Sequence, residues 1–301
     1  MILISMVMFT QIRGGCSCYN LPMLDIHKII IEHFVTELSV AYYEMYHSME
    51  PQYGNVVEWT GRLALENIAN SDALYHNVAH TIMVASVGQT ILKGKHLSEG
   101  GVTPRDWMHF MMALLCHDIG YVGGVCQLDG NGRFATGIGD ETVAIPADGT
   151  DAALTPYHVD RSMTFVRERF ANALIDDVDI ERINGYIAMT RFPIPKNDCC
   201  KSDGDYPSLT RSADFIGQLG DPDYFRKVPA LYYEFMEIGT DQKLGFKNPG
   251  DIRSDFTSFY WGVVRPHIQD ALDYLKITQE GKQWIANLYS HVFHAEHGGA
   301  V

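Results

Sequence analysis

The sequence predicts an all-α protein. Apolar residues recur at spacings of three and four from residue 23 onward, and the strict alternation typical of strands is nearly absent. Hydrophobic residues make up 46% of the 301-residue chain and charged residues 20%, which is typical of a globular protein. We therefore expect residues 23–301 to form a single all-helical domain, preceded by a poorly ordered extension at residues 1–22.

The elements follow from this periodicity and from capping residues. The first helix is predicted within "MLDIHKIIIEHFVTELSVAYYEMYHS", where Ile26, Ile30 and Phe34 begin an apolar stripe. The stretch "VTPRDWMHFMMALLCHD" predicts another helix, with Thr103 as its N-cap and Pro104 as its first residue. The aromatic run "LYYEFM" at 231–236 is interpreted as a packing face. Further helices are expected at 78–93, 158–175, 178–190, 208–220, 223–238, 252–276 and 279–296.

One long stretch, residues 120–149, departs from the helical pattern. It holds eight glycines in thirty positions, and within it "RFATGIGDETVAIP" could form at most a small hairpin. Long loops inside compact domains are uncommon and often functional. Because this loop directly follows His117 and Asp118, we interpret it as a lid or wall of a site; a solvated insertion is the alternative.

Charge and cysteine content limit the partners to be expected. The net charge of −14 would repel a nucleic acid, and the 23 Lys and Arg residues form no basic stripe that could outweigh it. The apolar N-terminal stretch "MILISMVMFT" is too short to span a membrane. The spacing of the six cysteines fits neither a zinc knuckle nor a disulfide framework. We expect a cytoplasmic protein that binds neither nucleic acid nor membrane.

A set of histidines and aspartates has the composition of a metal site. His76 and His80 lie one helical turn apart in "YHNVAH", and His117 and Asp118 are adjacent at the end of an apolar helix. An aspartate buried there without a partner would be costly, and a cation would supply the partner. Asp214, within the apolar segment "SADFIGQL", is the candidate for a second carboxylate. Two imidazoles and two carboxylates suit Zn, Fe, Mn or Ni.

This set resembles the H…HD…D pattern of the HD-domain superfamily of metal-dependent phosphohydrolases. "YHNVAH" with "HDIGYVG" is more narrowly similar to the cyclic nucleotide phosphodiesterase branch, over roughly residues 72–270 with a metal-site core at about 72–220. The resemblance implies an HD-type helical bundle with the glycine-rich loop beside its metal site. It implies that His80, His117, Asp118 and Asp214 hold a tightly bound metal.

The same resemblance implies a reaction. Asp118 would bridge to a second ion, Mg or Mn, and the two ions would share a hydroxide that attacks phosphorus. His76 matches the general acid that protonates the leaving alkoxide. Asp118 and His76 are therefore the expected catalytic residues, and a small phosphodiester or phosphomonoester, such as a cyclic nucleotide, is the expected substrate.

Other positions match the family motifs in the surroundings of the site. Asn77 would hold the turn or orient a ligating histidine. His158 would lie beside the metals or bind the second one, with a structural histidine as the alternative. Thr190 matches the threonine of the ATD motif, and Phe259 matches the aromatic clamp on the purine.

Several positions depart from the family pattern, and each bears on the substrate more than on the metal. Tyr121 replaces the histidine of HDxxH, and Arg191 replaces the aspartate of ATD. Thr155 stands where we place the glutamate that orients the acid, so His76 is expected to lack its carboxylate partner. Phe256 replaces the glutamine that binds the purine, and a phenyl ring offers neither the donor nor the acceptor of an amide.

The sequence also allows two other functions. Some HD proteins use two irons to cleave C–C or C–P bonds with O₂, but they need two further histidines before the last aspartate, and only His158 lies in that interval. The other is a non-catalytic, metal-stabilised domain with a regulatory or ligand-binding role. The apolar helices near both ends of the chain also allow a homodimer.

Overall fold

The computed structural model describes residues 24–171, 177–195 and 204–298, and most of these residues are helical. The predicted all-α character is confirmed, while the extension expected at 1–22 lies outside the described residues. In chain order the elements are α1 (Ile26–Tyr46), α2 (Pro51–Ile68), α3 (Val78–Glu99), α4 (Pro104–Cys116), η1 (Ile119–Tyr121), β1 (Arg133–Ala135), β2 (Thr142–Ala144), η2 (Asp151–Leu154), α5 (His158–Phe170), α6 (Ile180–Ala188), α7 (Tyr206–Leu219), α8 (Tyr224–Glu237), α9 (Thr240–Leu244), α10 (Pro249–Phe259), η3 (Tyr260–Val264), η4 (Arg265–His267), α11 (Gln269–Leu275) and α12 (Gln279–His297).

The structure corrects two of the helix predictions. Helix α2, which begins at Pro51, lies outside the predicted ranges. The single helix predicted at 252–276 is divided into α10, a π turn (η3), a 3₁₀ turn (η4) and α11. Pro266 lies at this division, and proline interrupts an α-helix because it has no backbone N–H and its ring clashes with the preceding turn.

Helix α4 forms the centre of the core. Every residue from Trp107 to Cys116 is buried, because α2, α3 and α6 pack around it. Its start is fixed by a capping box in which the side chains of Thr103 and Asp106 each accept from the other's backbone N–H. The C-terminal end of α4, which carries His117, therefore lies in the protein interior.

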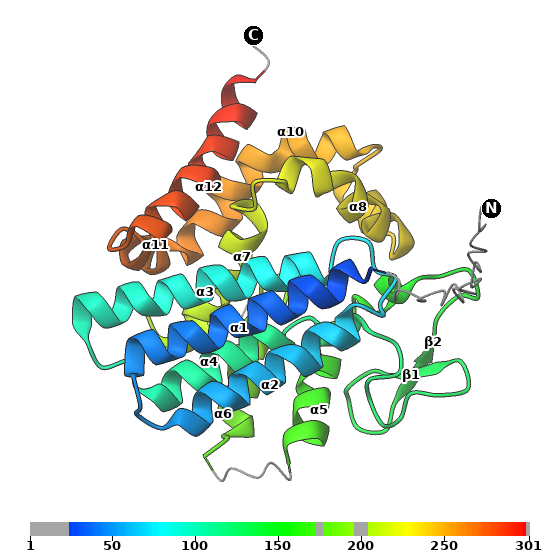
Figure 1. Ribbon diagram of the computed structural model, residues 1–301. Helices are drawn as coiled ribbons and strands as arrows, with labels where there is room; N and C mark the ends of the chain where they lie inside the picture. The colour runs from blue at the N-terminus through cyan, green and yellow to red at the C-terminus, as the bar shows by residue number, and fades with distance from the viewer. Residues whose placement is uncertain (1–23, 172–176, 196–203, 299–301) are drawn as a thin grey trace, which may run out of the picture.

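Four of the later helices lie on the other side of α3 from α4 (Figure 1). Figure 1 shows α8, α10, α11 and α12 gathered above α3, with α1, α2, α4 and α6 below it. Helix α7 packs against both α3 and α4. Within the described residues, no helix is both long and apolar enough to cross a membrane.

The glycine-rich stretch 120–149 is fastened to α5 by one buried arginine. Nε of Arg161 donates to the carbonyl of Gly120 (2.6 Å), and its two terminal nitrogens each lie 3.0 Å from one carboxylate oxygen of Asp129. These terminal nitrogens also donate to the carbonyls of Ala135 and Val122. The expected small hairpin is present as β1 paired antiparallel with β2. One guanidinium thus holds several separate points of the loop together.

Candidate metal centre

The four predicted ligands come from three helices that meet in the interior. His80 lies in the first turn of α3, His117 and Asp118 directly follow α4, and Asp214 lies on α7. Helix α3 packs against both α4 and α7. Segments that are far apart in the sequence therefore bring these four side chains together.

Distances between the polar atoms are those of a shared ion site. Nε2 of His80 lies 3.2 Å from Oδ2 of Asp118 and 3.6 Å from Oδ1 of Asp214. Nε2 of His117 lies 3.1 Å and 3.7 Å from the same two oxygens. Two ligand atoms about 2.1 Å from one ion and 90–110° apart are roughly 3.0–3.4 Å from each other. The observed separations are close to this value.

Two buried atoms of this cluster have no hydrogen-bond partner. They are Nε2 of His117 and Oδ2 of Asp118, which lie close together without the alignment of a hydrogen bond. Nδ1 of His117 is 2.7 Å from the carbonyl of Leu114, so it carries the proton and leaves the lone pair on Nε2. Unpaired buried polar atoms are costly, and a cation between them would remove that cost. These residues therefore fit a divalent metal ion.

The pKa shifts within the cluster also favour a bound cation. Burial lowers the pKa of His80, but Asp118 and Asp214 outweigh it and raise the pKa to about 10. Burial would raise the pKa of Asp118, but the nearby positive charge of His117 and the closeness of His80 hold it well below its usual range. The two aspartates thus create a negative potential strong enough to attract a cation.

His158 approaches the cluster from α5. Its Nδ1 is 2.6 Å from the carbonyl of Thr155, and its Nε2 is 3.8 Å from Oδ1 of Asp118. Burial lowers the pKa of His158, which favours the neutral imidazole that metals bind. His158 therefore presents a free lone pair to the Asp118 oxygen that points away from His80.

Asn77 fixes the turn that carries His80. It is the N-cap of α3, and its side-chain oxygen accepts from the backbone N–H groups of Ala79 and His80. Its side-chain nitrogen donates to the carbonyl of Leu74 (2.8 Å). Asn77 thus contacts the backbone of this turn on both sides of His76.

His76 has a carboxylate partner, so the expectation that it lacks one is wrong. Nδ1 of His76 lies 2.6 Å from Oε2 of Glu234 on α8. The other oxygen of Glu234 accepts from the backbone N–H of Tyr75 (2.6 Å) and of His76 (3.2 Å). Glu234 is buried, and the charge of His76 lowers its pKa against the opposing effect of burial. The run "LYYEFM" is thus more than a packing face.

Thr155 and Tyr121 have other roles. The hydroxyl of Thr155 donates to the carbonyl of Ala152 and also hydrogen-bonds the hydroxyl of Tyr121. The ring of Tyr121 stacks between two imidazoles, with centroids 4.3 Å from His76 and 4.5 Å from His158. Tyr121 therefore keeps the two histidines apart and fixes their ring planes.

A cavity of about 480 Å³ opens beside the cluster. His76, Asp118, Asp214 and His158 line it, whereas His80 and His117 lie behind them. Ligand pockets in proteins commonly have volumes of 300–1,000 Å³. Of the glycine-rich stretch 120–149, only Tyr121 lines this cavity, so the wall role predicted for that stretch rests on this residue.

Comparison with known families accounts for nearly the whole chain. A family model described as Npun_R2479-like matches residues 24–298. The chain belongs to the Npun_R2479-like family. Neither the search of curated proteins nor the search of solved structures gives a match. What this Npun_R2479-like protein does must therefore be argued from its site.

Three further predicted positions line the cavity of this Npun_R2479-like protein: Thr190, Phe256 and Phe259. The hydroxyl of Thr190 donates to the carbonyl of Ile187. Phe256 is 2% exposed and packs against the rings of Tyr224 and Phe225, with centroids 5.5 and 5.3 Å away. It contributes an apolar wall at the position where the resemblance expects a glutamine.

Arg191, which replaces an aspartate of the family pattern, also lies at the cavity. Its two terminal nitrogens are 2.9 and 2.7 Å from the carboxylate oxygens of Asp160 on α5. A bidentate pair of this kind orients both groups. Arg191 thus links the end of α6 to α5 next to the cluster.

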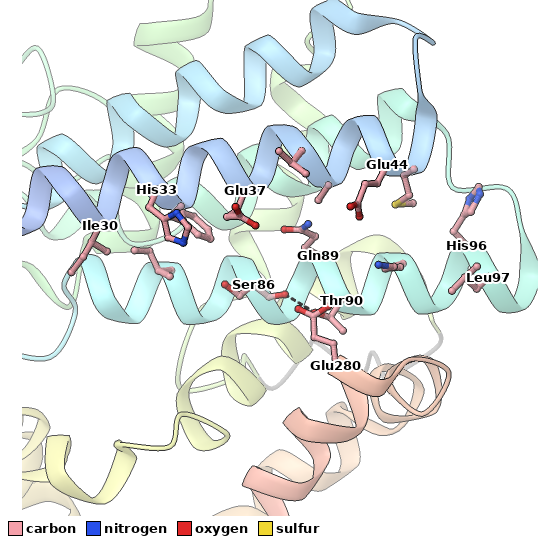
Figure 2. Close-up of a pocket in the computed structure, with 16 residues that line it drawn as sticks. Ile30, His33, Glu37, Glu44, Ser86, Gln89, Thr90, His96, Leu97 and Glu280 are labelled. Atoms are coloured by element: carbon pink, nitrogen blue, oxygen red, sulfur yellow. Dashed lines mark hydrogen bonds between the residues drawn. The ribbon is translucent and has the colours of Figure 1, made fainter.

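A larger hollow of about 680 Å³ lies elsewhere, between α1 and α3. Figure 2 shows His33, Glu37 and Glu44 along α1 facing Gln89 and Thr90 on α3, with Glu280 of α12 at its edge. None of the clustered metal-type ligands lines it. The smaller cavity, which does contain them, is therefore the candidate functional site.

Proposed function

We propose that this chain is an HD-type, divalent-metal-dependent phosphohydrolase that hydrolyses a small phosphate ester. The observation that supports it best is the set of short distances that join Nε2 of His80 and of His117 to the carboxylates of Asp118 and Asp214 beside a cavity. The H…HD…D order of these residues and their helical setting support the HD assignment. Zn, Fe, Mn and Ni suit this donor set, and Asp118 with His158 would hold a second ion such as Mg or Mn.

His76 is the residue proposed to act as the acid. Glu234 holds its Nδ1, which leaves Nε2 directed to the cavity that His76 lines. The contact with Glu234 fixes the position of the imidazole, and the stacked ring of Tyr121 fixes its plane. From this position Nε2 can donate a proton to the oxygen of the departing alcohol.

Asp118 is the proposed centre of the reaction because it has one oxygen on each side of the cluster. Its Oδ2 faces His80 and His117, and its Oδ1 faces His158. Divalent ions bound there would lower the pKa of a water molecule and offset the charge of the phosphoryl group. Asp118 would hold the ions in position, and His76 would supply the proton.

The test combines metal analysis with hydrolysis. We expect the purified protein to contain stoichiometric divalent metal and to hydrolyse members of a panel of cyclic nucleotides, nucleotides and model diesters. The products to measure are the ring-opened nucleotide, inorganic phosphate and the released alcohol, respectively. Asp118→Ala should lose both metal and activity, and His76→Asn should retain the metal but lose at least about 10²-fold in kcat. Asp140→Asn, an exposed change outside the cavity, is the control.

The same measurements distinguish the other functions. Full metal occupancy without hydrolysis of any ester would favour a non-catalytic, metal-stabilised domain. Two irons per chain with oxygen consumption would favour the oxidative reaction instead.

A further inference from the structure

We infer that the ester bound by this cavity is the phosphate of an apolar alcohol, aryl or alkyl, rather than a nucleotide. This inference rests on the proposed function and concerns the apolar side chains that line the cavity together with the metal-type ligands. It follows from these side chains and from the state of the polar groups on the lining.

The side chains that line the cavity are of two chemical kinds. Asp118, Asp214, His76 and His158 supply the metal-type and acid–base groups. Apolar side chains come from α8, α9, α10 and the segments that connect and follow them, and we call the part of the cavity that they line its apolar end. The main ones are Leu231, Phe235, Leu244, Phe246, Ile252 and Val263.

The polar side chains that could hydrogen-bond to a nucleobase already make hydrogen bonds to other protein groups. The amide of Gln218 hydrogen-bonds the Tyr224 hydroxyl. Arg191 is bonded by both terminal nitrogens to Asp160. Nε of Arg211 donates to the carbonyl of Met189 (2.9 Å). A base placed here would lose its hydrogen bonds to water without an equivalent replacement, which is costly.

Two other polar groups on the lining, Asp255 and Ser258, are exposed. They lie on α10 in contact with solvent, so they can be hydrated while the apolar end is filled. Asp255 would also repel a second phosphate, which disfavours a nucleoside diphosphate or a dinucleotide.

Aromatic and aliphatic side chains also form the mouth of the cavity. The rings of Phe192, Phe215 and Phe259 meet edge to face, with centroids 5.9 to 6.5 Å apart. Phe192 is 51% exposed and Leu244 is 55% exposed. An apolar group bound against them would remove this surface from water, and each buried methylene contributes about 0.8 kcal/mol, or roughly four-fold in affinity.

The reaction on such an ester is balanced by water alone. The oxygen of water forms a bond to phosphorus, and the bond between phosphorus and the ester oxygen breaks. The leaving oxygen takes the proton from Nε2 of His76, and the proton released by the attacking water returns the acid to its starting state. The products are the free apolar alcohol and inorganic phosphate.

The first experiment measures kcat/KM for ethyl, butyl and hexyl phosphate by phosphate release. AMP is measured in the same way, and 3′,5′-cyclic AMP is measured by the formation of AMP. The leaving alcohols differ little in acidity, so differences report on the apolar end of the cavity. We expect kcat/KM to rise by up to about four-fold per methylene, and hexyl phosphate to exceed both nucleotides. A flat series, or a preference for either nucleotide, would overturn the inference while leaving the phosphohydrolase function in place.

Two variants test whether the preference for longer alkyl chains arises at the apolar end of the cavity. Phe246→Asn introduces a polar group at the apolar end and should reduce the hexyl-to-ethyl ratio of kcat/KM by at least ten-fold. Tyr233→Ala removes an exposed ring of α8 that does not line the cavity, and it should leave the ratio unchanged. An equal ratio in wild type and Phe246→Asn would contradict the proposed location.

Binding gives a readout that does not need turnover. Hexylphosphonate and ethylphosphonate cannot lose an alcohol, and calorimetry on the metal-loaded protein measures their Kd values. Tighter binding of hexylphosphonate, by ten-fold or more, supports the apolar end, and equal Kd values overturn it. If no ester is hydrolysed by fully metal-loaded protein, the proposed function fails and this inference fails with it.

Discussion

Oε2 of Glu234 lies 2.6 Å from Nδ1 of His76, and this contact joins α8 to the turn before α3. The same carboxylate also accepts from two backbone N–H groups of that turn. One buried side chain therefore fixes both the backbone of this turn and the position of the His76 imidazole. If His76 is the acid, Glu234 is its positioning residue.

Replacing Glu234 should separate turnover from metal binding. In Glu234→Gln the amide can still contact the turn, but the carboxylate oxygen that accepts from Nδ1 of His76 is lost, so we expect kcat to fall by about 10²-fold. Metal content should stay at the wild-type value, because Glu234 is not among the clustered ligands. Glu234→Asp should recover part of kcat if positioning is the cause.

Glu237→Gln, three residues further along α8, is the matched control. Glu237 accepts from the backbone N–H and the hydroxyl of Thr150, away from the cavity. It should retain wild-type kcat. A loss of metal in Glu234→Gln, or an equal loss of kcat in Glu237→Gln, would contradict the positioning role.

Removal of metal should lower thermal stability. A ligand at 100 times its Kd stabilises the folded state by about 2.7 kcal/mol, so chelation of the ion should lower Tm by several degrees. Asp214→Ala should bind less metal, and its Tm should respond little to the chelator. Differential scanning fluorimetry with and without EDTA measures both effects, and equal shifts in wild type and variant would count against Asp214 as a ligand.

The buried pair of Arg161 and Asp129 should be important for stability. Arg161→Met leaves the Asp129 carboxylate buried without its counterion, which we expect to cost about 3–5 kcal/mol of unfolding free energy. Arg161→Met combined with Asp129→Leu should recover part of that loss, because no uncompensated charge remains. Urea unfolding of the three proteins measures this, and a double variant no more stable than Arg161→Met would refute the explanation.

This pair also predicts an acid dependence. Burial raises the pKa of Asp129, but its hydrogen bond to Arg161 outweighs that effect and lowers the pKa below the usual 3.8. A lowered folded-state pKa gives stability that is present above the unfolded value and is lost as pH falls through the folded value. We therefore expect the unfolding free energy to decrease as the pH falls below about 4. In the double variant Arg161→Met, Asp129→Leu, this decrease should be smaller, because residue 129 no longer titrates.

Gly120→Ala should disturb the contact between the glycine-rich loop and α5. A Cβ at Gly120 would lie 1.9 Å from the carbonyl oxygen of His158 and 2.8 Å from the nitrogen of Ser162. The first turn of α5 would have to move, at a cost of about 1–3 kcal/mol, and His158 would move with it. Gly130→Ala is the control, because nothing lies within 4 Å of its Cβ. Similar Tm values for the two variants would contradict the close packing.

The sequence predicts well what depends on local pattern. Apolar periodicity predicts the long helices, and the start of α4 follows from Thr103 and Pro104. The metal-type cluster is also predictable, because a buried aspartate such as Asp118 needs a cation, and the residue types that hold one are few.

The missed features depend on distant pairing. Nothing within "LYYEFM" shows that the carboxylate of Glu234 reaches His76, since that contact joins α8 to residues before α3. Its aromatic neighbours are sufficient to explain the run as a packing face.

Two other corrections need no distant contact. Pro266 indicates a break in the helix predicted at 252–276, and Pro51 indicates the start of α2.

Arg161 binds the glycine-rich loop to α5 through five hydrogen bonds to four residues of the loop. The loop is therefore poorly suited to move aside when substrate enters or product leaves. Phe192 and Leu244 line the cavity and are themselves exposed, so the cavity meets solvent at these residues. We therefore expect substrate to enter and product to leave near Phe192, which follows α6, and Leu244, which ends α9. The rate of product release should then respond to changes around Leu244 and not to changes in the β1–β2 hairpin.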